Sequence, residues 1–521
     1  MSHHINIIDL FAGPGGLGEG FSSFKTSAAP GGVFRIRASV EKESSAHDTL
    51  TLRALYRALA GTKEAKHYHT YVTGEISKND LISTVPQEWS MALEETLERP
   101  SALGLDNERI HRRIRQLLKA HNKDPWVVIG GPPCQAYSLV GRSRNMGISG
   151  YRAEDDHRHF LYREYLEILD VVQPDVFVME NVKGILTAKV GGEHIFSNIR
   201  KDLEHPASAL GKRRSNGRTY KLRSFVMPLG SNSLFEQDYS EDKSFVIRAE
   251  NHGIPQARHR VILLGIATDI DREPNTLKAA ARVPVDQVLT GLPKLRSRLS
   301  KGVDSGNNWR ESIEDQVSRL SRELKGRGQT ALLEEIQQRV ARLKFNAPTK
   351  SDKYERVPFS GKLSAALARW LNHDMPAKVL NHESRGHIPG DLGRYFFSAC
   401  WAVAYRNTDT VVPKAKDFPD CLAPDHSNWN SGHFADRFRV QAKGRPATTV
   451  TSHISKDGHY FIHPDPSQCR SLTVREAARI QTFPDNYYFE GGRTQQYVQV
   501  GNAVPPYLAV QLAEIVWQLL E

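Results

Sequence analysis

The stretch Ile5-Asn6-Ile7-Ile8-Asp9-Leu10-Phe11-Ala12-Gly13-Pro14-Gly15-Gly16 decides the fold of this chain. Its first seven residues form an apolar run that is typical of a buried strand. A glycine-rich turn follows at once, and Gly13, Gly15 and Gly18 have the GxGxxG spacing that lets a nucleotide-type ligand approach the backbone closely. The chain therefore begins as an α/β domain, although this turn alone does not choose between NAD, FAD and S-adenosylmethionine.

Further short apolar runs recur along the first half of the chain, and each ends near a Gly, Pro, Glu or Asn. They are Arg37–Val40, Trp126–Ile129, Val176–Met179 and Val261–Leu264. A helical pattern over Phe160–Val172 lies between two of them, which favours parallel strands joined by crossover helices. Glu41 ends the second strand and is well placed to accept hydrogen bonds from ribose hydroxyls, so an adenosine-bearing ligand is favoured.

Length and composition indicate a folded, enzyme-sized protein. The 521 residues exceed one ordinary domain and favour two domains, one of them discontinuous. A hydrophobic share of 39% with 25% charged residues is typical of a globular protein and excludes a disordered chain. The formal net charge of +11 suits a protein that meets phosphate backbones, but charge alone is weak evidence for nucleic-acid binding.

The cysteines lie far apart and form no CxxC pair, so neither a zinc site nor a disulfide framework is indicated and no metal is expected. They are Cys134, Cys400, Cys421 and Cys469. No stretch approaches the length of a membrane span. These features predict a cytoplasmic protein in a reducing compartment, with no membrane association.

After about Ile266 the alternation of strands and helices stops, and sequence rich in Lys, Arg, Gly and Asn runs to roughly Gly444, which predicts a second domain. Within it, apolar residues at helical spacing predict two amphipathic helices that pack onto their own domain. These residues are Ile313, Val317, Leu320 and Leu324, then Leu333, Ile336, Val340 and Leu343. A basic cluster in the first half is either a solvated loop or a DNA contact. It comprises Lys212, Arg213, Arg214, Arg218, Lys221 and Arg223.

The chemistry is carried by three strand ends. Gly130-Gly131-Pro132-Pro133-Cys134-Gln135-Ala136-Tyr137-Ser138 follows one strand, and the prolines fix the backbone so that Cys134 is exposed to a substrate. The next strand delivers Glu180 to the same edge, and a thiol beside a carboxylate without a histidine excludes a cysteine protease. In Gln256-Ala257-Arg258-His259-Arg260, strand alternation puts Gln256, Arg258 and Arg260 on one face, where guanidinium donors suit a base edge or a phosphate.

Seven motifs, in this order, resemble those of the DNA cytosine-5 methyltransferase family of bacterial restriction-modification systems. The first four are Phe11-Ala12-Gly13-Pro14-Gly15-Gly16, Pro133-Cys134-Gln135, Glu180-Asn181-Val182 and Gln256-x-Arg258-x-Arg260. They are followed by Arg445-Pro446-Ala447-Thr448-Thr449, by Leu472–Gln481 with Phe483-Pro484-Asp485, and by Gly501-Asn502-Ala503-Val504-Pro505-Pro506. The resemblance covers nearly all of residues 5–270 and 435–521.

The resemblance implies a Rossmann-like α/β sheet that uses S-adenosylmethionine, with helices on both faces, and a smaller, irregular target recognition domain. It assigns residues 1–285 and 441–521 to the catalytic domain, whose closing helix packs beside the cofactor site, and residues 286–440 to target recognition. The cofactor contacts that it implies are Phe11, Ala12, Gly13, Gly15, Gly16, Glu41, Glu75, Pro133, Asn502 and Ala503. Glu75 departs from the family, which usually has Asp in a Gly-Asp-Ile turn where this chain has Gly74-Glu75-Ile76.

The catalytic roles follow from the chemistry of cytosine, whose C5 is a poor nucleophile. Cys134 attacks C6 as thiolate, Glu180 donates to N3, and Arg258 or Arg260 holds O2 and supports the carboxyl group. The base must leave the stacked duplex for this attack, and a basic loop after Cys134 would close on the DNA. The DNA contacts expected on these grounds are Gln135, Ser138, Arg142, Arg144 and Gln256.

Two alternatives remain at this point. A related branch with similar motifs and a compact middle region methylates cytosine in tRNA, and a catalytically silent DNA-binding protein would keep the fold without turnover. The presence of Cys134, Glu180, Arg258 and Asn502 argues against the silent protein. The expected partners are double-stranded DNA and a cognate restriction endonuclease that acts separately, and the chain is expected to be a monomer.

Overall fold

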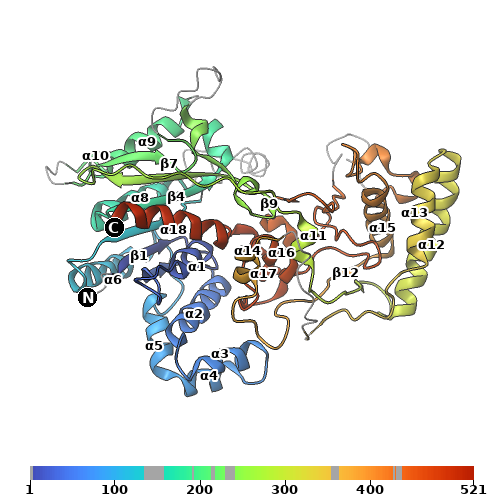
Figure 1. Ribbon diagram of the computed structural model, residues 1–521, viewed down its shortest axis with the longest axis horizontal. Helices are drawn as coiled ribbons and strands as arrows, with labels where there is room; N and C mark the ends of the chain where they lie inside the picture. The colour runs from blue at the N-terminus through green and yellow to red at the C-terminus, as the bar shows by residue number, and fades with distance from the viewer. Residues whose placement is uncertain are drawn as a thin grey trace.

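The computed structural model describes residues 4–133, 158–190, 193–212, 217–228, 241–351, 353, 363–425, 429 and 437–521. Figure 1 shows a larger lobe built around a sheet and a smaller lobe on the right that contains α12, α13 and α15. The C-terminal helix α18 lies in the larger lobe beside β1 and α1. Both ends of the chain therefore belong to the larger lobe, as the sequence predicts.

The sheet of the larger lobe has seven strands, in the order β2-β1-β3-β4-β10-β7 with β8 paired to β10. The strands are β1 (Ile5–Leu10), β2 (Phe34–Val40), β3 (Trp126–Gly130), β4 (Val176–Val182), β7 (Tyr220–Ser224), β8 (Val246–Arg248) and β10 (His259–Ala267). The first four in spatial order are parallel, whereas β10 is antiparallel to β4, β7 and β8. The predicted strands are present, but the strand at Val261–Leu264 belongs to an antiparallel edge, so the sheet is mixed.

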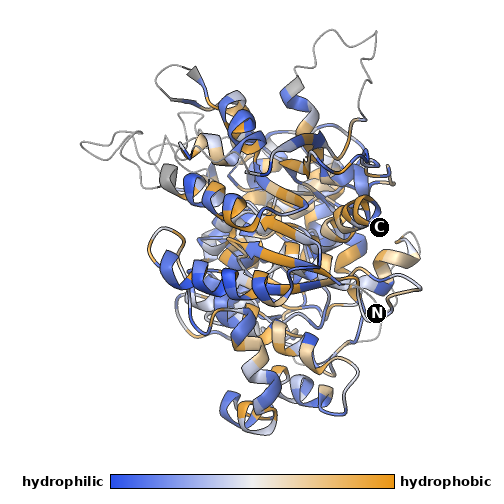
Figure 2. Ribbon diagram, turned by 90° about the vertical axis from the view of Figure 1, so that its left-hand side faces the viewer, coloured by the Kyte–Doolittle hydropathy of each residue, from blue (hydrophilic) through white to orange (hydrophobic). Residues whose placement is uncertain are grey.

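Helices cover both faces of this sheet, because alternate residues of each central strand point to opposite sides. On one face, Ile8 and Val128 pack with α6 (Asn107–Ala120), α8 (Arg158–Val172) and α9 (Phe196–Glu204). On the other, Ile7 and Val127 pack with α1 (Gly16–Ser23) and α18 (Pro506–Leu520). Figure 2 shows the strands as a hydrophobic layer between helices with hydrophilic outer faces. Burial on both faces explains the continuous apolar runs in the sequence.

The region from 44 to 120 is helical. Its helices are α2 (Ser44–Leu59), α3 (Ala65–Val72), α4 (Lys78–Thr84), α5 (Pro86–Glu95) and α6. Apolar residues of α2 to α5 form a separate small core that includes Leu55, Tyr68 and Leu81. These helices follow β2 directly, so the sheet has no further strand on that side among the described residues.

Within the described residues, one stretch, Arg493–Leu520, is apolar and long enough to cross a membrane by composition alone. It comprises α17 (Arg493–Asn502) and α18, which are separated at Ala503, and 61% of its most apolar window is buried in the molecule. Leu508, Leu512 and Val516 pack on α1 and the sheet. These helices are therefore part of the core of the larger lobe.

The smaller lobe has the two amphipathic helices predicted from the sequence, α12 (Gly306–Gly326) and α13 (Thr330–Val340). They pack against α15 (Pro389–Ala404) within the lobe, through residues such as Ile313, Leu320 and Phe396. Leu332 is in this core and the predicted Leu333 is half-buried, whereas Ile336 and Leu343 are buried as predicted. The middle of the chain is thus more helical than the irregular domain that was expected.

Part of the middle region packs on the closing part of the chain. Val285 and Val288 of α11 (Val285–Leu289) and Leu367 and Leu371 of α14 (Ala365–Leu371) share a core with residues of α16 (Val474–Ile480) and α17. The separate core of the smaller lobe is built mainly from α12, α13 and α15. Helices α11 and α14 therefore lie at the junction between the two lobes, where they pack on α16 and α17.

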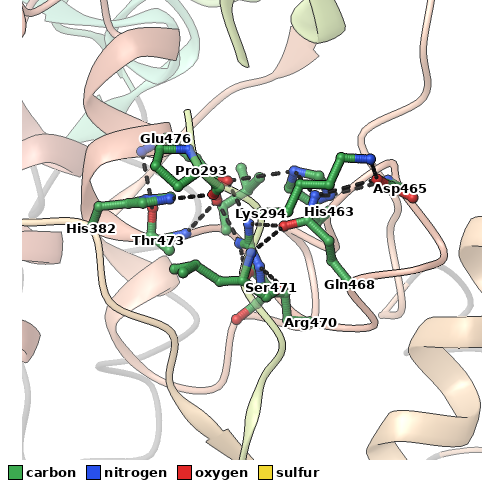
Figure 3. A network of polar contacts seen from close by, with 12 residues as sticks. Pro293, Lys294, His382, His463, Asp465, Gln468, Arg470, Ser471, Thr473 and Glu476 are labelled. Carbon is green, nitrogen blue, oxygen red and sulfur yellow. Dashed lines mark hydrogen bonds and ion pairs between the residues drawn. The ribbon is translucent and has the colours of Figure 1, made fainter. Parts of the chain in front are cut away.

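A network of polar groups holds this junction (Figure 3). Arg470 donates to both carboxylate oxygens of Glu476 at 2.6 Å, and both side chains are buried. His382 lies with Nε2 2.9 Å from the Pro293 carbonyl and Nδ1 2.9 Å from Thr473 Oγ1. Lys294 pairs with Asp465 at 3.0 Å. The network thereby joins the chain where it enters the smaller lobe to the segment that returns from it.

The buried histidines of this network predict a dependence of stability on pH. Burial lowers the pKa of His382 and of His463 to about 4. Between about pH 6.5 and about pH 4, the unfolded state therefore binds protons that the folded state does not bind. The free energy of unfolding falls as the pH drops through this range. The free energy of unfolding should be about 2 kcal/mol lower per histidine at pH 5.0 than at pH 7.5.

Urea denaturation of the wild type and of His382→Gln at these two pH values checks this. The variant should lose about one histidine's share of the pH dependence, whereas His205→Gln, which removes an exposed histidine, should behave as the wild type. Equal pH dependence in the wild type and in His382→Gln would contradict the assignment.

Candidate active site and cofactor site

The turn after β1 has the geometry of a ligand cradle. Phe11, Gly13 and Gly15 have positive φ values of 53°, 57° and 91°. The Ala12 N–H donates to the Val40 carbonyl at 3.1 Å, which anchors the turn to the end of β2. A Cβ on Gly13 would meet no atom within 4 Å, so the space in front of this glycine is open. The turn can therefore accept a ligand at its backbone.

Glu41 joins this turn to the start of α2. One carboxylate oxygen accepts from the Gly13 N–H at 2.8 Å and the other from the Glu43 N–H at 2.7 Å. Burial raises the pKa of Glu41, against the effect of these backbone donors. Each oxygen keeps a lone pair for a further donor, as a ribose hydroxyl requires. The acceptors and the open cradle therefore fit an adenosine-bearing cofactor.

The closing part of the chain packs directly against the cofactor turn. A Cβ on Gly16 would collide with the Val504 carbonyl, and one on Gly20 would collide with Ala509, so both glycines permit the close approach of α1 and α18. Asn502 is exposed at the end of α17, and Ala503 beside it is buried. The structure thus brings the two predicted closing contacts next to Gly16, at the opposite end of the sequence.

Glu180 lies at the carboxyl end of β4, next to the end of β3. Its Oε1 is 2.9 Å from Arg260 Nε. A Cβ on Gly131 would lie 3.0 Å from Glu180 Oε2, so this carboxylate borders the start of the Pro132-Pro133 segment. The Asn181 side chain donates to the Pro132 carbonyl at 3.1 Å and fixes that segment to β4. The predicted Glu180 and Arg260 therefore meet beside Pro133.

Several predicted residues lie outside the described part of the chain. They are Cys134, Gln135, Ser138, Arg142 and Arg144, together with Arg213 and Arg214 of the basic cluster. Pro133 is the last described residue before Cys134. The described part of the site therefore consists of the segment up to Pro133 together with Glu180 and Arg260.

Gln256 is not a DNA contact in this structure, contrary to the prediction. It is 0% exposed, its Nε2 donates to Gln481 Oε1 at 2.9 Å, and its Oε1 accepts from the Val450 N–H at 2.7 Å. Strand alternation gives the face on which Gln256 lies, and the closing segment covers that face. Gln256 therefore joins β9 (Gln256–Ala257) to the closing segment.

The two arginines of the same motif have different positions. Arg258 is 2% exposed and donates to the Val450 carbonyl at 2.7 Å and to the Gly501 carbonyl at 3.4 Å. Burial lowers the pKa of the Arg258 guanidinium well below its usual value. Of the two candidates that the sequence left open, Arg260 supports the Glu180 carboxylate and Arg258 supports the backbone of the closing segment.

Glu75, which the resemblance implied as a cofactor contact, does not follow a strand of the sheet. It is exposed in the turn between α3 and α4, and its Oε1 accepts from Thr73 Oγ1 at 2.8 Å. Beside β2, the Ser101 N–H donates to the Glu41 carbonyl at 2.7 Å, in the direction in which another strand would pair. Among the described residues, no further strand pairs with β2 on this side, so Glu75 does not lie at an edge of the sheet.

The described members of the basic cluster include several ion-paired residues. Arg218 pairs with Asp175 at 3.0 Å, Arg223 with Glu273 at 2.7 Å and Lys212 with Asp170 at 2.8 Å. These contacts fix β7 and its flanking segments to the sheet, which favours the structural interpretation of the cluster over a DNA contact. The described residues contain no group of three or more His, Cys, Asp or Glu side chains that could hold a metal ion.

A pocket that the sequence did not indicate lies beside the Gln256–Arg260 segment. It has a volume of about 480 Å³. Its lining residues are Ala257, Arg439, Thr448, Thr449, Thr451, His453, Tyr460 and Phe461. Thr449 Oγ1 donates to the Ala257 carbonyl at 2.6 Å, which ties the pocket to the Gln256–Arg260 segment. The Arg445–Thr449 motif could have indicated this region, because its Thr448 and Thr449 line the pocket.

The sheet, the glycine turn and Glu41 define a methyltransferase of the Rossmann-like class that depends on S-adenosylmethionine. Residues 88–206 and 231–517 match the family model of the C-5 cytosine-specific DNA methylases. The chain belongs to this family, its cofactor is S-adenosylmethionine and its substrate is DNA.

Similar proteins extend over the whole chain. The type II methyltransferase M.Bpa9945I of Bacillus paralicheniformis is 32% identical, over 98% of both chains. M.AgeI of Thalassovita gelatinovora, also a type II methyltransferase, is 26% identical over 98% of both. A crystal structure assigned as a DNA modification methyltransferase of an Escherichia coli prophage covers 99% of both chains, with a TM-score of 0.50 and 18% identity. That similarity concerns the fold.

The burial of Gln256 predicts the effect of Gln256→Ala. The variant leaves the Val450 N–H and the Gln481 amide without their partner, so the free energy of unfolding should fall by about 2 to 4 kcal/mol. The salt dependence of DNA binding should not change, because no phosphate contact is lost. Urea denaturation and DNA titrations at several salt concentrations check this, and a stable variant with weakened DNA binding would show that Gln256 contacts DNA.

Proposed function

We propose that this protein flips a cytosine out of duplex DNA and methylates its C5 through a covalent adduct between Cys134 and C6. The observation that carries the proposal is the Glu180–Arg260 pair, 2.9 Å apart, beside the segment that leads into Cys134. A thiol and a supported carboxyl group at one strand edge are what addition to a cytosine ring requires.

The reaction begins when the Cys134 thiolate adds to C6 and negative charge develops towards N3 and O2. Glu180 transfers a proton to N3. Arg260 holds the Glu180 carboxyl group and would stabilise the negative charge that develops at O2. The cofactor supplies a methyl group on a sulfonium. Removal of the C5 proton, elimination of Cys134 as thiolate and return of the N3 proton to Glu180 then restore the aromatic ring.

The cysteines among the described residues do not compete with Cys134 as the nucleophile. Burial raises the pKa of the Cys400 and Cys469 thiols well above the usual range, and burial together with Glu323 raises that of Cys421 to about 12. Each therefore stays protonated and a poor nucleophile at neutral pH. Cys134 remains the nucleophile that the motif indicates.

The pocket beside Ala257 supports a contact with the DNA backbone close to the flipped base. The Thr451 and Arg439 side chains line it, and hydroxyl and guanidinium groups bind phosphate oxygens. Residues 286–440 would read the target sequence, and Arg142 and Arg144 would close on the duplex. The contacts of Phe11, Glu41, Asn502 and Ala503 with the cofactor are part of the same proposal.

The protein would serve as the modification enzyme of a restriction-modification system, as a monomer, with an endonuclease that acts separately. The names of M.Bpa9945I and M.AgeI as type II methyltransferases support this context. The tRNA alternative is not supported, because the family model is that of DNA methylases and the middle of the chain has a separate helical core, whereas the tRNA branch was expected to have a compact middle region.

The covalent step predicts capture of the enzyme on modified DNA. Duplex DNA that carries 5-fluorocytosine at the target should form a cofactor-dependent adduct that resists denaturant, because fluorine cannot leave as the C5 proton does. Cys134→Ser should bind DNA without forming the adduct. Cys421→Ser, which removes a half-buried thiol of the smaller lobe, should form it as the wild type does. An undiminished adduct in Cys134→Ser would exclude Cys134 as the nucleophile.

The acid role predicts that Glu180→Gln cuts single-turnover methyl transfer by about 10²- to 10⁴-fold with nearly unchanged affinity for S-adenosylmethionine. The amide keeps the size of the side chain and a hydrogen bond to the base edge, but it cannot transfer a proton to N3. Glu273→Gln is the matched control, because it removes the exposed partner of Arg223 on the same sheet. Methyl transfer at the wild-type rate in Glu180→Gln would limit Glu180 to a structural role.

A further inference from the structure

The cofactor turn has a support at its back that comes from the other end of the chain. The Tyr487 hydroxyl donates to the carbonyl of Pro14, between Gly13 and Gly15. Tyr487 follows α16 and is 0% exposed. The side chain therefore acts on the cofactor turn from inside the protein, without access to the cofactor itself.

The Tyr487 ring is held in a fixed position. The guanidinium of Arg53 lies 4.6 Å from its centroid, and the ring of Phe483 lies at 4.7 Å. Arg53 donates to both carboxylate oxygens of Glu19, through Nε at 2.9 Å and Nη2 at 2.6 Å. Glu19 belongs to α1, which begins at the cofactor turn. The ring, Arg53 and the first helix thus form one buried network.

The turn is closed on the side of Tyr487 and open on the opposite side. A Cβ on Gly15 would lie 3.2 Å from the Tyr487 hydroxyl oxygen and 2.8 Å from Leu50 Cδ2, whereas Gly13 faces open space. Gly15 also has a φ of 91°, which favours glycine. Burial raises the pKa of Tyr487 well above its usual value, so the hydroxyl keeps its proton and remains a donor.

We propose that Tyr487 is a positioning residue for the cofactor: its hydroxyl fixes the Pro14 carbonyl and thereby the path of the turn that receives S-adenosylmethionine. The proposal rests on cofactor binding at this turn and is independent of the covalent mechanism. Loss of the hydroxyl leaves a buried carbonyl without its donor and allows the turn to move. The effect therefore falls on cofactor affinity, because Tyr487 touches neither the reacting base nor the thiol.

The test is Tyr487→Phe, which keeps the ring and removes the hydroxyl. Its Kd for S-adenosylmethionine, and for S-adenosylhomocysteine, should rise about 5- to 30-fold in calorimetric titrations without DNA. The KM for the cofactor should rise similarly, and kcat at saturating cofactor should stay within about twofold of the wild type.

Tyr497→Phe is a closely matched control. Tyr497 is also buried, its hydroxyl donates to the Leu472 carbonyl at 2.7 Å, and Arg385 lies 4.4 Å above its ring. It should show a comparable loss of thermal stability with an unchanged Kd. An unchanged Kd in Tyr487→Phe, or an equal rise in both variants, would overturn the proposal. Failure of the wild type to bind the cofactor would instead contradict the cofactor site.

Discussion

The catalytic lobe depends on buried hydrogen bonds between its first half and the segment that returns from the smaller lobe. Arg258, which directly precedes β10, donates to the carbonyls of Val450 and Gly501. Gln256 donates to Gln481 and accepts from the Val450 N–H. A buried guanidinium or amide without partners costs several kcal/mol, so these side chains need the closing segment in place. The sheet and the closing segment therefore stabilise each other across more than 190 positions of sequence.

Helix α16 extends this principle to the junction between the lobes. Arg475 and Arg479 are both buried, and Arg479 donates to both carboxylate oxygens of Asp485. Arg479 also donates to the Val288 and Thr290 carbonyls, and Arg475 to the Leu380 carbonyl. With the Arg470–Glu476 pair, this short helix joins four separate parts of the chain. Planar guanidinium groups suit such a position because each offers several donors in fixed directions.

The same packing gives the two sites their precision. Asn181 fixes the segment before Cys134 to the strand that bears Glu180, and Glu180 is held in turn by Arg260. Glu41 fixes the cofactor turn from β2, and the closing segment supports it from behind through Val504 and Tyr487. A methyl donor and a flipped base must meet within bond-forming distance, so rigid strand ends are an advantage for this chemistry.

The sequence by itself determined the strands, the order of the motifs and the two amphipathic helices. Apolar periodicity and glycine spacing are local properties, and they can be read before the chain is folded. The sequence also predicted that an arginine of the Gln256–Arg260 motif supports Glu180, but the antiparallel pairing that brings Arg260, at the start of β10, to the carboxyl end of β4 was decided by the structure.

Only the tertiary structure decided which neighbours cover each face. Gln256 and Arg258 bind the closing segment, and Arg260 pairs with Glu180. Glu75 lies in the turn between two helices, and Tyr487 donates to the Pro14 carbonyl. Alternation along a strand predicts the side of the sheet to which a side chain points. The partner of that side chain comes from a distant part of the chain, and a local sequence pattern does not identify it.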